Sequence, residues 1–464
     1  MSSNIDMDYY VGVDVGTGSA RAALVSSTGK ILKMTTCPLE IFHPAPNFYE
    51  QSSDNIWSAV CHVVKSVVAD ISAEYVRGIG FAATCSLVAI DKTGSPVTVS
   101  PTGEDKQNVI LWMDHRAQKE ADFINEQNHE MLQYVGGKVS LEMQTPKMLW
   151  LKNNLPSSWN RAALLFDLPD FLTWKATVQT HEYSIYNFLI RFQISMLFNN
   201  WRKIGNDVRT PGHRVDQGLS AKAASELGLL KRTAVGTSLI DAHAGGLGMI
   251  GCYVPGVSPK LQTLICGTST CHMIVNEKKL FVSGVWGPYF SAMVPGMWLS
   301  EGGQSATGKL LDHIIDTHPA TPGILKSLSG NKHIQQYLSE LLQTIADQKN
   351  LENVSYLTKD IHIWPDFHGN RSPLADPALK GMDSLYPLIM KTWHYYTCQN
   401  PLFIQIQADV LGLPVLCPIE KESVLIGAAI LGSYAAGRFN TVYDATQTMG
   451  GSANIVKPKN ECYK

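Results

Sequence analysis

The stretch from Tyr9 to Val25, YYVGVDVGTGSARAALV, decides how the chain begins to fold. Tyr9 to Val15 is rich in small and β-branched residues, which favour a β-strand. Gly16-Thr17-Gly18-Ser19 then supplies turn residues, and Arg21 to Val25 is strand-like again. A dinucleotide-binding unit would need a helix directly after the glycines, and a Walker loop would need Gly-Lys-Ser/Thr. The stretch therefore predicts two strands joined by a Gly-rich hairpin.

A second stretch, Leu261 to Val275, repeats this pattern. Apolar residues lead into Gly267-Thr268-Ser269, and Met273 to Val275 is apolar again. Two copies of one supersecondary device suggest two halves of similar fold. Chance similarity between two short turns stays open on this observation alone.

Strand and helix patterns alternate along the rest of the chain, which predicts the α/β class. Ser53 to Ala69 places Ile56, Val60 and Val67 on one helical face. Three further segments are expected to be a strand–loop–strand at Arg77 to Ile90 around Thr84-Cys85-Ser86, a helix at Gln304 to Ile315 opened by Glu301-Gly302-Gly303, and a small-residue helix at Glu422 to Ala436 suited to close packing beneath a ligand.

Bulk properties bound the class of protein. At 464 residues the chain is long enough for two domains of roughly 200 residues each. A net charge of −2 without a Lys/Arg run argues against a nucleic-acid partner. Nine scattered cysteines without a CxxC argue against metal or disulfide frameworks and favour a cytoplasmic protein with reduced thiols. The polar start lacks a signal peptide, and the apolar segment 186–198 is too short to cross a bilayer, so no membrane partner is expected.

The two Gly-Thr-Ser hairpins are candidate phosphate sites. Such turns expose backbone N–H groups and hydroxyls, which suit phosphate oxygens. Asp14 lies two residues before the first turn in an otherwise apolar strand, where a carboxylate needs a cation. A Mg²⁺-bound water or Arg21 would serve, and the alternative is an Asp that only caps the turn.

Asp241 is the candidate catalytic base. It ends an apolar run and opens a Gly/Ala-rich segment, Asp241 to Gly248. Phosphoryl transfer to a hydroxyl needs a carboxylate placed to accept the proton. A simple helix N-cap explains the same residue equally well, and His243 is more often structural than a ligand.

Recognition of a sugar needs hydrogen-bonding and aromatic groups gathered in one place. The candidates share a polar or aromatic loop character, which a solvated loop would also have. They are Tyr49-Glu50-Gln51, Ala83-Thr84-Cys85-Ser86, Trp112-Met113-Asp114-His115-Arg116 and Glu301.

At this point the residues resemble a known family, the FGGY carbohydrate kinases, and within it the D-ribulose kinase (ribulokinase-like) branch. The resemblance covers roughly 1–176, 202–381 and 400–440. Its marks are Val13 to Arg21, Glu50-Gln51, Trp112 to Ala117, Lys147-Met148-Leu149-Trp150, Asp170 to Trp174, Ile240 to Gly246, Cys266 to Ser269, Glu301 to Ser305, Phe367 to Pro373 and Gly427-Ala428-Ala429. Singly these motifs are weak, but in this order they are highly specific.

The resemblance implies two ribonuclease-H-like (actin/hexokinase-like ATPase) domains with an interdomain cleft. It implies an N-terminal domain at 1–238, with the sugar site and first phosphate hairpin, and a C-terminal nucleotide-binding domain at 239–464. Residue roles carried over from it are Asp241 as catalytic base, Asp14 near Mg²⁺, Thr17, Gly18, Ser19, Arg21, Gly267, Thr268, Gly308 and Asn400 at ATP, and Ala83, Thr84, Asp241 and Glu301 at the sugar.

Two segments depart from the family pattern. Val178 to Trp201 lacks the substrate-binding lysine of relatives, and Asp383 to Gln399 is too short for their helix, strand and Gly-Gly turn. The expected function is transfer of the γ-phosphate of Mg·ATP to the terminal hydroxyl of a free ketopentose, with D-ribulose giving D-ribulose 5-phosphate. The alternatives are a catalytically impaired member that binds a sugar or a protein, and a kinase for another ketose or polyol. A homo-oligomer stays open.

Overall fold

The computed structural model describes residues 8–177, 185–186, 203–205, 207–255, 262–266, 269–328, 333–352, 354–358, 363–376, 378–383 and 401–459. The fold divides into two compact units. The first unit lies within 1–263, 273–301 and 418–453, and the second within 264–272, 302–417 and 454–464. The domain boundary between residues 238 and 239 stays a prediction.

The predicted hairpin forms the centre of a mixed sheet in the first unit. Strand β1 (Tyr9–Val15) pairs antiparallel with β2 (Ser19–Ser26), which pairs with β3 (Ile31–Pro38). On its other side β1 runs parallel to β5 (Val76–Ala83). The short strands β11 (Ala234–Val235) and β12 (Leu239–Ile240) both pair parallel with β5. The strand–hairpin–strand prediction from the sequence is therefore confirmed.

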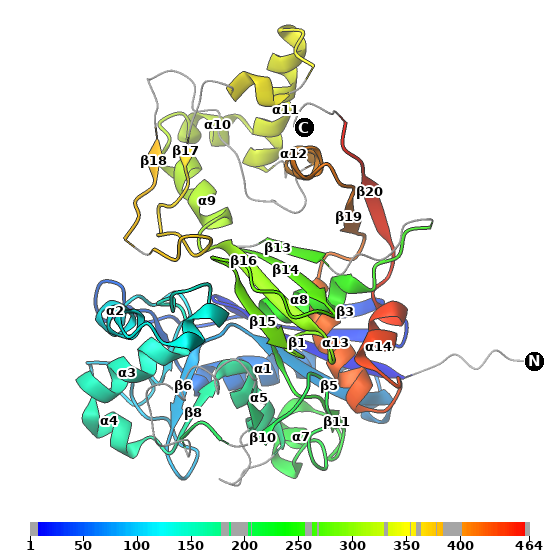
Figure 1. Cartoon of the computed structure of the whole chain (residues 1–464). Coiled ribbons are helices and arrows are strands. Elements are labelled where there is room, and N and C mark those ends of the chain that lie inside the picture. The colour runs from blue at the N-terminus through cyan, green and yellow to red at the C-terminus, as the bar shows by residue number, and fades with distance from the viewer. Residues whose placement is uncertain are drawn as a thin grey trace, which may run out of the picture. The chain divides into compact units, whose positions relative to one another are not determined.

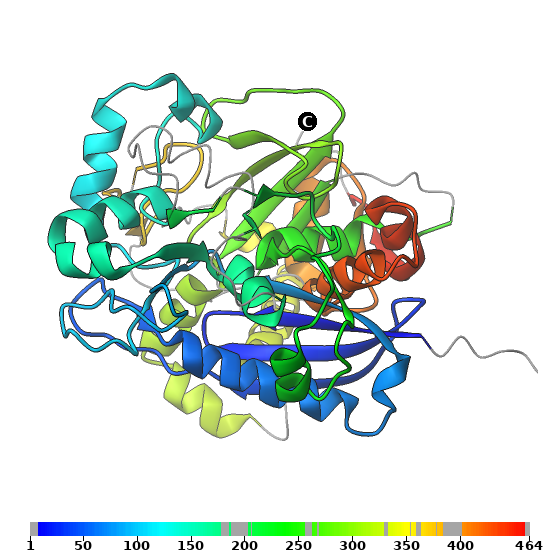
Figure 2. The same cartoon turned by 90° about the horizontal axis from the view of Figure 1, so that it is seen from below.

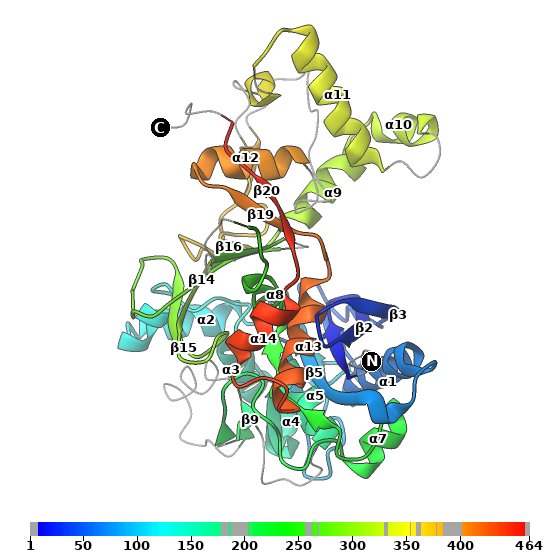
Figure 3. The ribbon, with the colours of Figure 1, turned by 90° about the vertical axis from the view of Figure 1, so that its right-hand side faces the viewer.

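Two helices cover the opposite faces of this sheet (Figures 1 and 3). Val11, Val13 and Val15 share a core with apolar residues of α1 (Ser53–Val68), which runs along the first strands in Figure 2. Because side chains alternate across a strand, Gly12 faces the other way, toward α13 (Ser423–Ala435). The alternation of valine and glycine thus assigns one helix to each face.

Helix α13 approaches its neighbours backbone to backbone. A Cβ added at Gly12 would lie 2.0 Å from Leu425 O, and one at Gly80 would lie 2.0 Å from Ala428 O. On another side of α13, a Cβ at Gly427 would lie 1.8 Å from Ala244 O of α8 (Asp241–Ile250). The close-packing role predicted for Glu422 to Ala436 is confirmed, because these contacts leave no room for a side chain.

A second sheet of the first unit has the order β4 (Glu50–Gln51), β7 (Val109–Ile110), β6 (Leu87–Ile90) and β8 (Leu164–Asp167). The predicted loop Thr84-Cys85-Ser86 joins β5 to β6. Other elements of this unit are α2 (Gln118–Glu126), α3 (Gln144–Asn154), α4 (Pro156–Arg161), α5 (Leu168–Thr177), β9 (Ile185–Tyr186), β10 (Asp207–Val208), α7 (Ala221–Leu227) and α14 (Val442–Met449), with short 3-10 turns at Ala73–Tyr75 and Glu130–Tyr134.

A four-stranded sheet contains the second copy of the hairpin pattern. Its order is β13 (Gln262–Cys266), β14 (Thr270–Asn276), β16 (Trp298–Gln304) and β15 (Trp286–Phe290). Strands β13 and β14 are neighbours, as the repeat predicted. The expected helix start at Glu301-Gly302-Gly303 is wrong, because these residues lie in β16. A Cβ at Gly303 would lie 2.0 Å from Thr270 O, so the glycine allows close approach within the sheet.

The helix expected at Gln304 to Ile315 begins later, as α9 (Gly308–Thr317) in the second unit. The other elements that include residues of this unit are α10 (Thr321–Ser327), α11 (Ile334–Gln348), a 3-10 turn at Val354–Thr358, β17 (Ile363–Trp364), β18 (Met382–Asp383), α12 (Pro401–Leu411), β19 (Val415–Pro418) and β20 (Ala453–Val456). Strand β17 pairs with β18, and β19 pairs with β20.

Candidate active site

Three neighbouring parallel strands of the first unit end at the same edge of their sheet. Val15 of β1 is in register with Ala83 of β5, and Ile240 of β12 is in register with the same Ala83. The residues that follow are the Gly16–Ser19 turn, Thr84 and Asp241, and Thr84 N donates to Val15 O at 3.0 Å. In α/β folds the carboxyl edge of parallel strands is where ligands bind. The sheet topology therefore gathers the candidates for phosphate, sugar and base.

Arg21 is the cation beside Asp14, one of the two partners that the sequence analysis proposed. Asp14 is 2% exposed, and its Oδ2 accepts hydrogen bonds from Arg21 Nε (3.1 Å) and Nη2. Asp14 and Arg21 face each other in the β1–β2 register, so the hairpin itself forms the pair. Burial raises the pKa of the Asp14 carboxyl, and the guanidinium opposes that rise by attraction and hydrogen bonding.

A second carboxylate, which the sequence analysis missed, also holds Arg21. Arg21 Nη1 donates to Glu422 Oε2 at 2.7 Å, although the two residues are 401 positions apart. Glu422 directly precedes α13. The local sequence around Arg21 or Glu422 does not predict this contact, because the contact depends on how α13 packs against β1.

Asp241 occupies the first position of α8, while Ile240 is the N-cap residue. Its Oδ1 accepts from its neighbour Ala242 N at 2.7 Å, and no hydrogen bond engages Oδ2 among the described residues. Burial, together with the negative charge of Asp14, raises the pKa of Asp241 to about 6; Ala242 N–H and His243 oppose that rise, and Glu301 adds to it. Asp241 thus has one available oxygen and a pKa suited to accept a proton near neutral pH.

Glu301 is paired with a histidine that the sequence analysis treated as structural. Glu301 is 5% exposed, and its Oε2 lies 3.0 Å from Nε2 of the fully buried His243. Both side chains affect the pKa of Asp241, which lies two residues before His243: His243 lowers this pKa and Glu301 raises it. Glu301, His243 and Asp241 therefore form one cluster at the start of α8.

The first hairpin is tied to the predicted sugar loops. Trp112 Nε1 donates to Thr17 Oγ1 at 3.0 Å, and Gln51 Nε2 donates to Thr17 O at 2.9 Å. The turn itself is closed by Gly16 N donating to Ser19 O at 3.0 Å. Gly18 is exposed, with open space where a Cβ would lie. Thr17, Gly18 and Ser19 thus form a braced turn that stays accessible.

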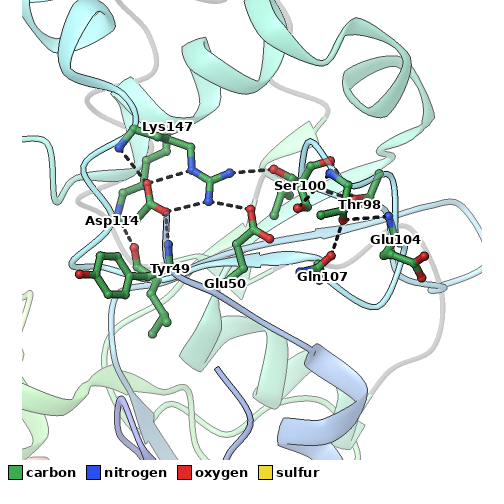
Figure 4. Close-up of polar contacts among 12 residues, drawn as sticks. Tyr49, Glu50, Thr98, Ser100, Glu104, Gln107, Asp114 and Lys147 are labelled. Carbon is green, nitrogen blue, oxygen red and sulfur yellow. Dashed lines mark hydrogen bonds and ion pairs between the residues drawn. The ribbon is translucent and has the colours of Figure 1, made fainter. Parts of the chain in front are cut away.

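Glu50, Asp114 and Arg116 form a buried ion network, and Figure 4 labels its two carboxylates, Glu50 and Asp114. Arg116 Nη2 donates to Glu50 Oε1 at 2.8 Å and to Asp114 Oδ2 at 2.7 Å, and all three side chains are fully buried. The guanidinium also stacks 4.1 Å from the ring centroid of Phe48. The solvated-loop alternative is wrong for these three residues, because their side chains are buried.

Lys147 completes this support. Its buried ammonium donates to the carbonyl oxygens of Leu111 and Trp112 at 2.8 Å each, and to Glu142 O at 3.2 Å. Burial lowers the pKa of Lys147 to about 8, although Asp114 opposes the change. Because its three protons are all used, Lys147 fixes the loop before Asp114 (Figure 4).

The remaining predicted residues lie elsewhere. Gly308 opens α9 in the second unit and is buried. Gly267, Thr268 and Asn400 lie outside the described residues, as do nearly all of the two departing segments 178–201 and 383–399. Their predicted roles stay predictions.

The described residues contain no group of three or more His, Cys, Asp or Glu side chains that could hold a metal by itself. Asp14 Oδ1 is nevertheless buried without a hydrogen-bond partner among them. Magnesium is usually held by one or two carboxylates plus substrate phosphates and waters, so a single unpartnered carboxylate oxygen fits that chemistry. In the part of the chain that the structure describes, no helix combines the length and apolar character needed to span a bilayer.

Solved structures show the class of fold. The chain resembles the xylulose kinase from Lactobacillus acidophilus with a TM-score of 0.73 at 15% identity, covering 97% of this chain and 94% of that one. It resembles the Plasmodium falciparum glycerol kinase with ADP with a TM-score of 0.72 at 13% identity, covering 98% and 94%. The expected two-domain, actin/hexokinase-like α/β class is therefore confirmed.

Sequence comparisons then give the family. The N-terminal domain model of the FGGY family of carbohydrate kinases matches residues 9–185, and its C-terminal domain model matches 263–384 and 397–436. The chain is 45% identical to the human FGGY carbohydrate kinase domain-containing protein, over 97% of this chain and 93% of the relative. It is 34% identical to a D-ribulokinase of Saccharomyces cerevisiae, over 97% and 75%. This chain belongs to the FGGY family of carbohydrate kinases, which are phosphotransferases.

The same comparisons show where this chain departs from its relatives. The alignment with the human relative spans 515 positions, whereas this chain has 464 residues, so the relative has internal residues that this chain lacks. The C-terminal family model leaves 385–396 unmatched, and the N-terminal model ends at 185. Both places coincide with the segments that depart from the family pattern.

Proposed function

We propose that this chain transfers the γ-phosphate of ATP to the terminal hydroxyl of a free ketopentose, with D-ribulose giving D-ribulose 5-phosphate. The observation that carries the proposal is the shared sheet edge at which the first hairpin, Thr84 and Asp241 begin. The D-ribulokinase among the relatives supports the choice of sugar. We place this activity in the cytoplasm.

In the proposed reaction, the terminal hydroxyl of the sugar gives its proton to Asp241 Oδ2, and the hydroxyl oxygen forms a bond to the γ-phosphorus of ATP. The bond from that phosphorus to the β-phosphate oxygen breaks, and ADP leaves. Thr84 and Glu301 orient the sugar, while His243 holds Glu301 in place. Arg21 and the backbone of Thr17 to Ser19 bind phosphate oxygens. Magnesium, when bound beside Asp14, balances phosphate charge.

The test is an ADP-release assay with purified chain, Mg·ATP and a panel of free ketoses and polyols. Turnover with D-ribulose above L-ribulose, xylulose and glycerol supports the proposal. Turnover with another member of the panel instead would overturn D-ribulose as the substrate but would still support kinase activity.

A second candidate, a catalytically impaired member that binds a sugar or a protein, is favoured by the unmatched segment 385–396. It predicts silence across the panel from folded chain. Direct titration with Mg·ATP separates the two candidates, because measurable nucleotide binding counts against loss of the nucleotide site.

The pKa of Asp241 gives a pH dependence to this reaction. A base must be deprotonated to act, so kcat/KM should be constant above about pH 7 and fall as the pH drops through about 6, the pKa of Asp241. The measurement is kcat/KM from pH 5 to 8, with fluorescence at each pH to confirm that the chain stays folded. The control is the residual activity of an Asp241→Asn variant, which should not show this fall in kcat/KM near pH 6. A profile that stays flat to pH 5 would exclude Asp241 as the titrating base.

A further inference from the structure

Glu422 stands where helix-capping acids usually stand, yet it does not cap its helix. It precedes Ser423 of α13, and its side chain makes no capping hydrogen bond. Its backbone N–H donates instead to Glu420 Oε1 at 3.1 Å. The carboxylate of Glu422 is directed to the first hairpin, where Oε2 accepts from Arg21 Nη1 at 2.7 Å.

The hydrogen bonds of the Arg21 guanidinium leave part of it free. A guanidinium has five N–H donors. Nε and Nη2 each donate to Asp14 Oδ2, and Nη1 donates to Glu422 Oε2. One N–H on Nη1 and one on Nη2 are not engaged by the described residues. The Arg21 side chain is 31% exposed, so these donors can meet a ligand.

The position of Glu422 matters because Asp14 alone fixes only one side of the guanidinium. Asp14 holds Nε and Nη2, whereas among the described residues Nη1 donates to Glu422 alone. Arginine recognises phosphate through two parallel N–H groups in a fixed fork, so its orientation determines how well it binds. A carboxylate on Nη1 sets that orientation.

We propose that Glu422 is a positioning residue for nucleotide binding: together with Asp14 it holds Arg21 so that the two remaining N–H donors face a phosphate of the nucleotide. This rests on the proposed function only in taking a nucleoside triphosphate as the ligand of the first hairpin. Glu422 does not itself touch the phosphate, because its negative charge would repel it. The helix that carries it is fixed by its backbone contacts to β1 and α8.

The test is calorimetric titration of the full chain with Mg·ATP, together with KM and kcat where turnover is found. Glu422→Gln should raise Kd for Mg·ATP about tenfold, as expected for losing one charge-assisted hydrogen bond, and should change kcat by less than about twofold. Glu420→Gln is the matched control, because it removes the same charge two residues away and keeps an acceptor for Glu422 N. An equal effect in both variants would mean that only the general charge matters, and would overturn the inference.

A double-mutant cycle separates positioning from a structural role. Arg21→Lys keeps the charge but removes the fork, so Glu422→Gln in that background should add little further loss of affinity. Fully additive losses, or tighter nucleotide binding by Glu422→Gln, would refute positioning, the latter because Glu422 would then compete with phosphate for Arg21. Nucleotide binding without sugar turnover refutes only the proposed function. A wild-type chain that binds no Mg·ATP refutes both.

Discussion

Replacing Asp241 with asparagine is expected to lower kcat by about 10²- to 10⁴-fold, the usual contribution of a general base. The change removes the proton-accepting carboxylate but keeps an oxygen that can accept from Ala242 N, now at 2.7 Å from Oδ1. Nucleotide affinity should stay close to that of the wild type, because the guanidinium and turn that bind phosphate are unchanged. Steady-state ADP release and Mg·ATP titration measure the two effects separately.

Stability provides an internal control for this variant. Burial raises the pKa of Asp241 to about 6, above the ordinary 3.8 of an unfolded chain, so the ionised side chain destabilises the fold above pH 6. Asparagine carries no such charge. The variant should therefore be at least as stable as the wild type at pH 8, and its advantage should shrink as the pH falls from 6 toward 4.

Urea unfolding at several pH values checks this expectation. Asp70→Asn is a matched substitution at an exposed ion pair with Lys33, and both activity and stability should change little there. Full turnover by Asp241→Asn would exclude it as the base, and an unfolded variant at pH 8 would contradict the charge argument.

The elements that sequence predicts well are those whose signal is local. The alternation around Gly12 specifies β1, and the spacing of Ile56, Val60 and Val67 specifies α1. The first hairpin needs only its own turn residues. The small residues of α13 indicate close packing, although the sequence cannot say what it packs against.

Predictions fail where a residue's role depends on a distant neighbour. A glycine such as Gly303 can open a helix or allow close approach between strands, and its local sequence does not separate these two roles. The structure does, because a Cβ at Gly303 would lie 2.0 Å from Thr270 O of the neighbouring strand. The partners of Arg21 and Glu301 show the same limit. Glu422 and His243 reach them through the packing of α13 and α8, which no motif spacing encodes.

Buried charge is a further limit on prediction. Charged side chains are almost never fully buried unless paired, so Glu50, Asp114 and Arg116 look like surface residues from composition alone. The structure places them in a network without solvent exposure, beneath the loop that carries Trp112. Within the predicted sugar loops, Glu50, Asp114 and Arg116 are therefore bound to one another in the interior.

Substituting alanine for Gly427 is expected to destabilise the chain by about 3 kcal/mol, the upper end of the usual cost of overpacking, because the contact is between backbone atoms. The new Cβ would lie 1.8 Å from Ala244 O and 2.6 Å from Ala244 C, and backbone atoms cannot rotate away as a side chain can. Helix α13 has no room to retreat, since Gly12 and Gly80 already bring β1 and β5 against its backbone.

The alternative to unfolding is a displacement of α8, which also begins with Asp241 three residues before Ala244. A shift of about 1 Å in a catalytic group costs on the order of 10²-fold in rate, so kcat/KM should fall even in molecules that remain folded. Gly323→Ala is the matched control, since its Cβ would meet no atom within 4 Å in α10. Gly323→Ala should keep or slightly raise stability, because alanine favours helix over glycine. A wild-type urea midpoint and activity for Gly427→Ala would show that α8 and α13 are further apart than described, and that the position of Asp241 does not depend on this contact.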